Sequence, residues 1–110
     1  MRFLTEVQRR ALASWAARNP AIRRVVLFGS RVKRTHRADS DLDIAIELEP
    51  CEDPNATLAN WMHLSTGWTV EVSEVVPFKV DLQWLDTFGT TKVIERAIEE
   101  ASETVYVRAK

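Results

Sequence analysis

The sequence predicts an α/β protein in which helices flank a small mixed β-sheet. Polar and apolar residues alternate over 41–48 and again over 79–84, as they do in strands with one buried face. Apolar residues recur at helical spacing before, between and after these two segments. A parallel or mixed sheet also needs a crossover element between paired strands. With 110 residues, the chain is expected to fold as one domain, 1–110, that buries about two-thirds of its unfolded surface.

A helix is predicted near the N-terminus. Thr5 and Gln8 have the spacing of a capping box, and Asn19-Pro20 marks the end of the helical pattern. The apolar residues of this helix form a single stripe: Leu4, Val7, Ala11, Leu12, Trp15 and Ala16. The apolar run 25–28 then predicts a buried strand that ends at Gly29.

The long segment that follows the second strand is ambiguous. Its apolar residues fall near helical spacing, yet its second half also alternates as a strand would. We favour a helix from about Asn55. A break in it near Gly67 and a strand over residues 68–76 are alternatives that stay open. At helical spacing, Trp61 and Trp68 are expected to pack in the core rather than to stack on a base.

The last third of the chain predicts a strand, a helix and a final strand or tail. The strand is expected to begin at Pro77-Phe78. Its apolar positions are Val80, Leu82 and Trp84. Residues 93–101 predict a short amphipathic helix, capped by Thr90 or Thr91, and residues 104–108 a last short strand or tail.

Composition and charge restrict the partners of the protein. A net charge of -1 and a pI near 6.1 argue against electrostatic binding of nucleic acid by the whole domain. The single Cys51 has no partner for a disulfide bond. No secretory signal pattern opens the chain, and no apolar run approaches the roughly 18 residues of a membrane span. We therefore expect a soluble, cytoplasmic protein with no membrane partner and no direct nucleic-acid partner.

Candidate phosphate-binding groups follow the first strand. Gly29 allows a sharp turn and a close approach of the backbone to a ligand. If Ser30 opens a turn or a short helix, its hydroxyl and the free backbone N–H groups would face an anion. Arg31 is the best placed cation of the basic segment 31–39 to receive phosphate, and the alternative is that this segment is a solvated loop.

Candidate metal ligands lie on the second and third strands. Alternation places Asp41 and Asp43 on the same face, roughly 7 Å apart at about 3.4 Å per residue. Their oxygens can converge on one or two Mg²⁺ ions, which prefer carboxylates plus substrate phosphates. Asp81 is the third candidate, because a carboxylate within an apolar strand is costly unless it is paired, hydrogen-bonded or bound to metal. The alternative for Asp81 is a solvent-facing position near Lys79.

Together, these motifs resemble those of the DNA polymerase β-type nucleotidyltransferases. They are most similar to the minimal nucleotidyltransferases, the MNT proteins paired with HEPN partners in prokaryotic toxin–antitoxin modules. The matching segments are Gly29-Ser30-Arg31, Asp39-Ser40-Asp41-Leu42-Asp43-Ile44 and Val80-Asp81-Leu82. The resemblance covers nearly the whole chain and implies the polymerase β-like nucleotidyltransferase fold. It also implies two sets of site residues: catalytic and metal-binding Asp41, Asp43 and Asp81, and nucleotide-binding Gly29, Ser30, Arg31 and Ser40.

The resemblance implies an antitoxin that transfers AMP from ATP to a tyrosine hydroxyl of a HEPN RNase toxin, with which it forms a hetero-oligomer. Two alternatives stay open: an antitoxin that neutralises its partner by binding alone, and a stand-alone nucleotidyltransferase acting on a small molecule or an RNA end. In the implied mechanism, Asp81 bridges a second Mg²⁺ ion or accepts the proton of the attacking hydroxyl. Three carboxylates so close together repel one another, so the pKa of at least one should be raised without metal.

Overall fold

The computed structural model describes residues 4–29, 32, 41–50, 53–76, 78–86 and 91–108. The helices and strands follow in the order α1 (Glu6–Ala17), β1 (Ile22–Phe28), β2 (Leu42–Leu48), α3 (Pro54–Val75), β3 (Val80–Trp84), α4 (Lys92–Glu100) and β4 (Ser102–Val107). This confirms the predicted α/β fold. Within the described ranges, no helix combines the length and the apolar character that crossing a membrane requires.

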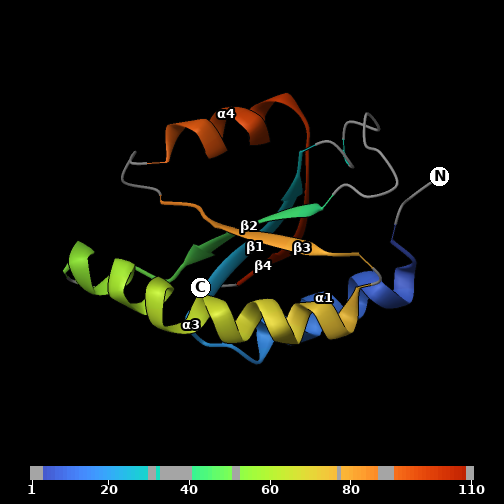
Figure 1. Ribbon diagram of the computed structural model, residues 1–110, viewed down its shortest axis with the longest axis horizontal. Coiled ribbons are helices and arrows are strands. Elements are labelled where there is room, and N and C mark those ends of the chain that lie inside the picture. The colour runs from blue at the N-terminus through green and yellow to red at the C-terminus, as the bar shows by residue number, and fades with distance from the viewer. Residues whose placement is uncertain are drawn as a thin grey trace.

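The sheet is mixed, with the strand order β3-β2-β1-β4 (Figure 1). β2 runs parallel to β3 and antiparallel to β1, while β4 runs antiparallel to β1. Because a hairpin cannot join parallel strands, the chain needs a crossover between β2 and β3. Helix α3 provides that crossover, as the sequence predicted.

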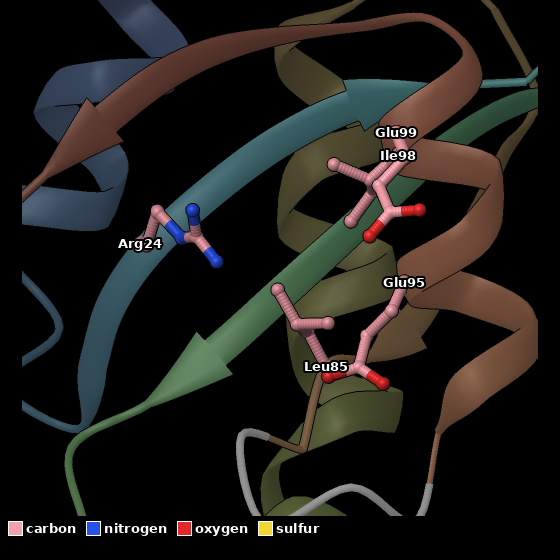
Figure 2. A pocket seen from close by; sticks show the side chains of 5 residues that line it. All are labelled: Arg24, Leu85, Glu95, Ile98 and Glu99. Atoms are coloured by element: carbon pink, nitrogen blue, oxygen red, sulfur yellow. The ribbon is translucent and has the colours of Figure 1, made fainter.

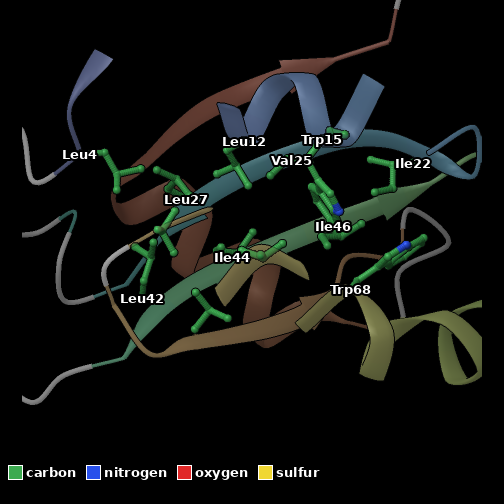
Figure 3. Packing of buried hydrophobic residues seen from close by; sticks show 14 of the residues in the cluster. Leu4, Leu12, Trp15, Ile22, Val25, Leu27, Leu42, Ile44, Ile46 and Trp68 are labelled. Carbon is green, nitrogen blue, oxygen red and sulfur yellow. The ribbon is translucent and has the colours of Figure 1, made fainter. Parts of the chain in front are cut away.

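The main core lies between the sheet and the two helices α1 and α3 (Figure 3). Trp15 of α1 and Trp68 of α3 meet edge to face, with ring centroids 6.1 Å apart. Each indole N–H has a hydrogen-bond acceptor at the edge of the core. Nε1 of Trp15 donates to Oε1 of Glu71 at 3.0 Å, and Nε1 of Trp68 donates to Oδ1 of Asn19 at 3.2 Å. The predicted core position of Trp68 is therefore confirmed.

Helix α4 covers the other face of the sheet (Figure 1). A second, smaller cluster lies between them and consists of Val26, Phe28, Ala45 and Leu85 with Ile94, Ala97 and Ile98 of α4. Strand β2 is consequently buried on both faces for most of its length, so the prediction of one buried face was incomplete. Since Ala45 faces α4, the alternation of β2 puts Asp43 and Glu47 on that side as well.

Helix α1 begins as predicted and ends under the C-terminal segment. Thr5 and Gln8 form both hydrogen bonds of a capping box, at 3.1 and 2.9 Å. Val7 was predicted to lie on the apolar stripe but is 77% exposed, because it points away from the side of the helix that carries Leu12, Trp15 and Ala16. At the other end, the guanidinium of Arg108 donates to backbone carbonyls of Ala16, Ala17, Asn19 and Ile22 at 2.9–3.4 Å.

Helix α3 continues without a break from Pro54 to Val75, so neither a break at Gly67 nor a strand over 68–76 is observed. The helix is preferred because Trp68 and Val72 lie on the core side, at 3% and 0% exposure, while Val70 between them is 59% exposed. A strand would place all three side chains on the same face. Asp53 caps the helix by accepting a hydrogen bond from the backbone N–H of Asn55 at 2.9 Å.

Several predicted boundaries differ from the structure by a few residues. Strand β1 begins at Ile22 rather than at residue 25, and β3 begins at Val80 rather than at 77–78. Thr91 is the N-cap residue of α4, but its hydroxyl bonds to the backbone of Asp86 instead of capping the helix. Residues 104–108 were predicted as a strand or a tail, and Ser102–Val107 forms strand β4. Cys51, Pro77 and Thr90 lie outside the described residues.

Candidate active site

The pairing of β2 with β3 brings two of the predicted carboxylates together. These strands are parallel, and their register places Asp43 directly beside Asp81. Asp41 lies just before β2, close enough for its charge to raise the pKa of Asp43. All three carboxylates are half-buried. The structure thus gathers Asp41, Asp43 and Asp81 at one end of the face that α4 covers.

Gly29 lies against this carboxylate group. It follows β1, whose last residue, Phe28, pairs with Asp43. Its φ of +84° falls in the left-handed region, which glycine adopts without strain. A Cβ atom at this position would lie 3.0 Å from Cγ and 3.2 Å from Cβ of Asp43, and it would overlap Oδ2 of the same side chain. Glycine is therefore needed here for two reasons. It allows the backbone turn, and it leaves the space that the Asp43 carboxylate occupies.

Within this group, the pKa of Asp43 is raised. Burial raises its pKa above the ordinary value, and the charges of Asp81 and Asp41 raise it further. The raised pKa agrees with the expectation for one of the three carboxylates, but burial contributes more to it than the repulsion between them. A cation placed beside Asp43 would offset the repulsion and favour the ionised form.

The donor set suits Mg²⁺. Carboxylate oxygens are the protein ligands that this ion prefers, and it commonly takes only one or two of them, with substrate phosphates and water completing its shell. Among the residues that the structure describes, no three acidic, His or Cys side chains converge closely enough to form a complete metal site by themselves. The described carboxylates could therefore supply only part of the coordination shell of such an ion.

Comparison with known proteins identifies the family. The family described as polymerase beta, nucleotidyltransferase matches residues 10–110. The chain belongs to this nucleotidyltransferase family. Among curated protein sequences, none matches it significantly.

Three solved structures resemble this nucleotidyltransferase in fold. A toxin–antitoxin with AMP-PNP has a TM-score of 0.55 and 21% identity, over 96% of this chain and 75% of the other. A complex of tri-AMPylated Shewanella oneidensis HEPN toxin with MNT antitoxin has a TM-score of 0.61 and 17% identity, over 96% and 74%. A mutant of the toxin–antitoxin MntA-HpeT has a TM-score of 0.54 and 16% identity, over 92% and 73%. At these identities, the similarity shows a common fold.

Part of the predicted nucleotide site lies outside the described residues of the nucleotidyltransferase. Ser30, Arg31 and Ser40 lie outside the described residues, and so does most of the basic segment 31–39. Of the predicted nucleotide-binding residues, Gly29 is the one that the structure describes.

Gln83 is a neighbour of the site that sequence reasoning missed. Its Nε2 donates a hydrogen bond of 2.8 Å to Oδ2 of Asp81. The signal was present in the alternation of β3, because residues 81 and 83 must share one face of the strand. This bond holds Oδ2 of Asp81 in place.

The sequence also did not indicate how Glu47 is buried on the same face. Its carboxylate lies 3.2 Å from Nε of Arg23 and 3.0 Å from Nη2 of Arg24, and the residue is only 8% exposed. Two ion pairs offset the cost of burying this charge. Glu47 is therefore a structural carboxylate, separate from the group around Asp43.

A pocket of about 340 Å³ lies between α4 and the sheet (Figure 2). It is lined by Arg24, Leu85, Glu95, Ile98 and Glu99. Neither Asp43 nor Asp81 lines it. Arg24 pairs with Glu47 in the strand register, so the pocket lies toward the other end of β2 from the carboxylate group.

Proposed function

We propose that this protein is an antitoxin that acts as a protein adenylyltransferase, transferring AMP from ATP to a tyrosine of a cognate HEPN RNase toxin in a Mg²⁺-dependent reaction. The observation that carries the proposal is the carboxylate group: Asp43 and Asp81 are in register on parallel strands, Asp41 lies close enough for its charge to act on Asp43, and Gly29 packs against Asp43. Nucleotidyl transfer needs positioning and charge neutralisation at phosphate, and this is what clustered carboxylates provide once they hold a cation.

The structural relatives support the choice of partner and nucleotide. One is a toxin–antitoxin with AMP-PNP, and another is a complex that contains a tri-AMPylated HEPN toxin. A protein acceptor and an adenine nucleotide are therefore the substrates to test first with this chain. The neutral to acidic charge of the chain agrees with a protein acceptor better than with a nucleic-acid acceptor.

The reaction is an in-line displacement at the α-phosphorus of ATP. The tyrosine oxygen forms a bond to that phosphorus, and the bond to the oxygen that bridges the α- and β-phosphates breaks. Pyrophosphate leaves with the electron pair of the broken bond. The proton of the tyrosine hydroxyl passes to a carboxylate oxygen of Asp81 and from there to solvent.

Each residue of the group has a separate task. Asp41 and Asp43 would hold Mg²⁺, and Asp81 accepts the proton of the tyrosine hydroxyl. When bound, Mg²⁺ neutralises phosphate charge and lowers the pKa of the attacking hydroxyl. Gln83 orients Asp81 through the bond to Oδ2, and Gly29 leaves room for the carboxylate of Asp43 beside the backbone.

The test measures transfer of label from α-labelled ATP to the purified toxin partner. Asp43→Asn and Asp81→Asn should each lower the rate by more than about 100-fold, because even groups that only orient metal ligands are worth about 10- to 100-fold. Asp53→Asn is the matched control: Asp53 is exposed and caps α3, and asparagine caps a helix equally well. Full activity of Asp43→Asn and Asp81→Asn would refute the mechanism.

A second measurement separates catalysis from binding. The Asp41→Ala protein is tested for neutralisation of the toxin in cells, alongside the wild type. We expect protection to be lost, since the proposal makes modification of the toxin the basis of neutralisation. If protection were retained while label transfer was abolished, binding alone would account for antitoxin activity. Mg²⁺ with ATP should also raise the melting temperature of the wild type, because ligands that bind only the folded state stabilise it.

A further inference from the structure

The pocket between α4 and the sheet combines apolar and charged walls. Leu85 and Ile98 give it apolar surface. Figure 2 shows the charged groups: Arg24 of β1 lies across the pocket from Glu95 and Glu99 of α4. Its volume of about 340 Å³ is near the lower end of the range for ligand pockets, which is roughly 300–1,000 Å³. A pocket of this size has room for one long side chain or one small molecule.

The two carboxylates of the pocket have no counter-ion in the part of the chain that the structure describes. Neither Glu95 nor Glu99 forms a salt bridge there. The two cations of α4, Lys92 and Arg96, line a separate hollow. Glu95 and Glu99 are four residues apart on the same side of α4, and like charges at this spacing destabilise a helix. A cation bound in the pocket would relieve this repulsion.

Arg24 does not neutralise these carboxylates. Its Nη2 lies 3.0 Å from Oε1 of Glu47, which also pairs with Arg23. Together with Glu95 and Glu99, the region holds three glutamates against two arginines, which leaves one negative charge. Nε of Arg24 is buried and has no hydrogen-bond partner among the described residues. Because buried donors are nearly always bonded, Arg24 needs an acceptor that these residues do not provide.

These features define the chemistry of an occupant. A single cationic group at the end of an aliphatic stem can pair with Glu95 and Glu99. The stem can cover the apolar surface of Leu85 and Ile98. Lysine and arginine side chains have this form. A polypeptide also carries carbonyl oxygens that can accept a hydrogen bond from Arg24, whereas a free alkylamine carries no acceptor. A basic side chain of a protein therefore satisfies every group that lines the pocket.

The pocket lies on the side of the sheet that a protein acceptor must approach. Asp43 and Glu47 both lie on the α4 side, four residues apart on β2. This separation is about 14 Å, at about 3.4 Å per residue. A standard interface buries roughly 800 Å² on each partner, which corresponds to a patch roughly 28 Å wide. A protein whose tyrosine reaches Asp43 can therefore also reach the pocket.

The charge of the proposed partner is complementary to the pocket. An RNase binds the phosphate backbone of RNA, and lysine and arginine side chains supply much of that affinity. We propose that the pocket receives an arginine or lysine side chain of the toxin and anchors the toxin while its tyrosine reaches the carboxylate group. This inference rests on the proposed function, because it takes the toxin as the protein that is bound.

Isothermal titration calorimetry with the purified toxin partner tests the anchor. The titration is carried out without ATP, so that no transfer takes place. Glu95→Gln and Glu99→Gln should each raise the dissociation constant by at least about 3-fold, and together by about 10-fold, as expected for partly exposed ion pairs. The matched control is Glu74→Gln, which removes the same charge at an exposed position of α3, on the other side of the sheet, and should leave the dissociation constant unchanged.

Two further readouts separate anchoring from a structural role. The variants Glu95→Gln and Glu99→Gln should melt no lower than the wild type, because each removes a like-charge repulsion. In label transfer from ATP, the KM for the toxin should rise with the dissociation constant while kcat stays unchanged, since the pocket is remote from the reacting atoms. A fall in kcat without a change in KM would overturn the proposal.

Two binding results would also overturn it. One is a toxin affinity that Glu95→Gln and Glu99→Gln change no more than Glu74→Gln does. The other is an unchanged toxin affinity together with binding of butylguanidinium to the wild type, which would assign the pocket to a free small cation. If toxin binding weakens as expected but no label is transferred, the anchor stands and the proposed catalytic function falls. If transfer occurs with an unchanged KM in the variants, the catalytic function stands and the anchor falls.

Discussion

Replacing Gly29 by alanine tests the contact on which the carboxylate group depends. The backbone there has a φ of +84°, and holding alanine in the left-handed region costs about 1–2 kcal/mol. The new Cβ atom would also lie 3.0 Å from Cγ of Asp43. Ordinary carbon–carbon contacts are about 3.5–4.0 Å, so the Asp43 side chain must withdraw by at least roughly 0.5–1 Å, and its Oδ2, which the new atom would overlap, must turn away.

The two effects predict separate readouts. The free energy of unfolding should fall by about 1–2 kcal/mol, which lowers the melting temperature by roughly 5–15 °C for a domain of this size. A displacement of about 1 Å in a reacting constellation costs about 100-fold in rate, so label transfer from ATP should fall by about that factor. Thermal denaturation measures the first effect, and transfer at a temperature where both proteins are folded measures the second.

Gly67→Ala is the matched control because it makes the same substitution in open space. Gly67 lies inside α3, and the nearest atom to an added Cβ would be Oε2 of Glu71, at 4.0 Å. Alanine in a helix interior is favoured over glycine by about 0.5–1 kcal/mol, so this variant should melt higher than the wild type and retain full activity. A Gly29→Ala protein with the stability and activity of the wild type would refute the packing of Gly29 against Asp43.

Three further predictions concern charge. In protein stripped of metal by a chelator, Asp43→Asn should melt higher than the wild type at neutral pH. Burial and the neighbouring carboxylates raise the folded-state pKa of Asp43, so its contribution to stability is complete below the ordinary value of 3.8 and is lost as the pH rises through the raised pKa. The advantage should vanish below that ordinary value, and equal melting temperatures at neutral pH would contradict this. Arg108→Met should lower the free energy of unfolding, measured by urea denaturation, by about 2 kcal/mol, because it removes charged hydrogen bonds to backbone carbonyls. Its control is Arg10→Met, at a side chain that is 79% exposed, which should change that free energy by less than about 0.5 kcal/mol. Glu47→Gln should also lower the free energy of unfolding by about 2 kcal/mol. This is less than the about 3–5 kcal/mol of a fully buried pair, because the paired arginines are one-third exposed. A loss below about 0.5 kcal/mol would show that these ion pairs do not stabilise the fold.

Local patterns predicted local geometry well. The spacing of Thr5 and Gln8 predicted the capping box, and the alternation over 41–48 predicted that Leu42, Ile44 and Ile46 share a buried face. Both depend only on the periodicity of a single helix or strand. The same kind of pattern failed where two periods fitted equally, as in the second half of α3. There the burial of Trp68 and Val72, together with the exposure of Val70 between them, decided in favour of helix.

Contacts between distant segments could not be read from these patterns. Sequence alone predicted the fold class, the crossover between β2 and β3, and the identity of the acidic residues. Only the tertiary structure decided that Asp81 lies beside Asp43, that Gly29 packs against that carboxylate, and that α4 covers the same face. The reason is that periodicity reports how one segment repeats along its own axis. The register of paired strands and the covering of a sheet are instead set by how whole elements bury their apolar surfaces against one another.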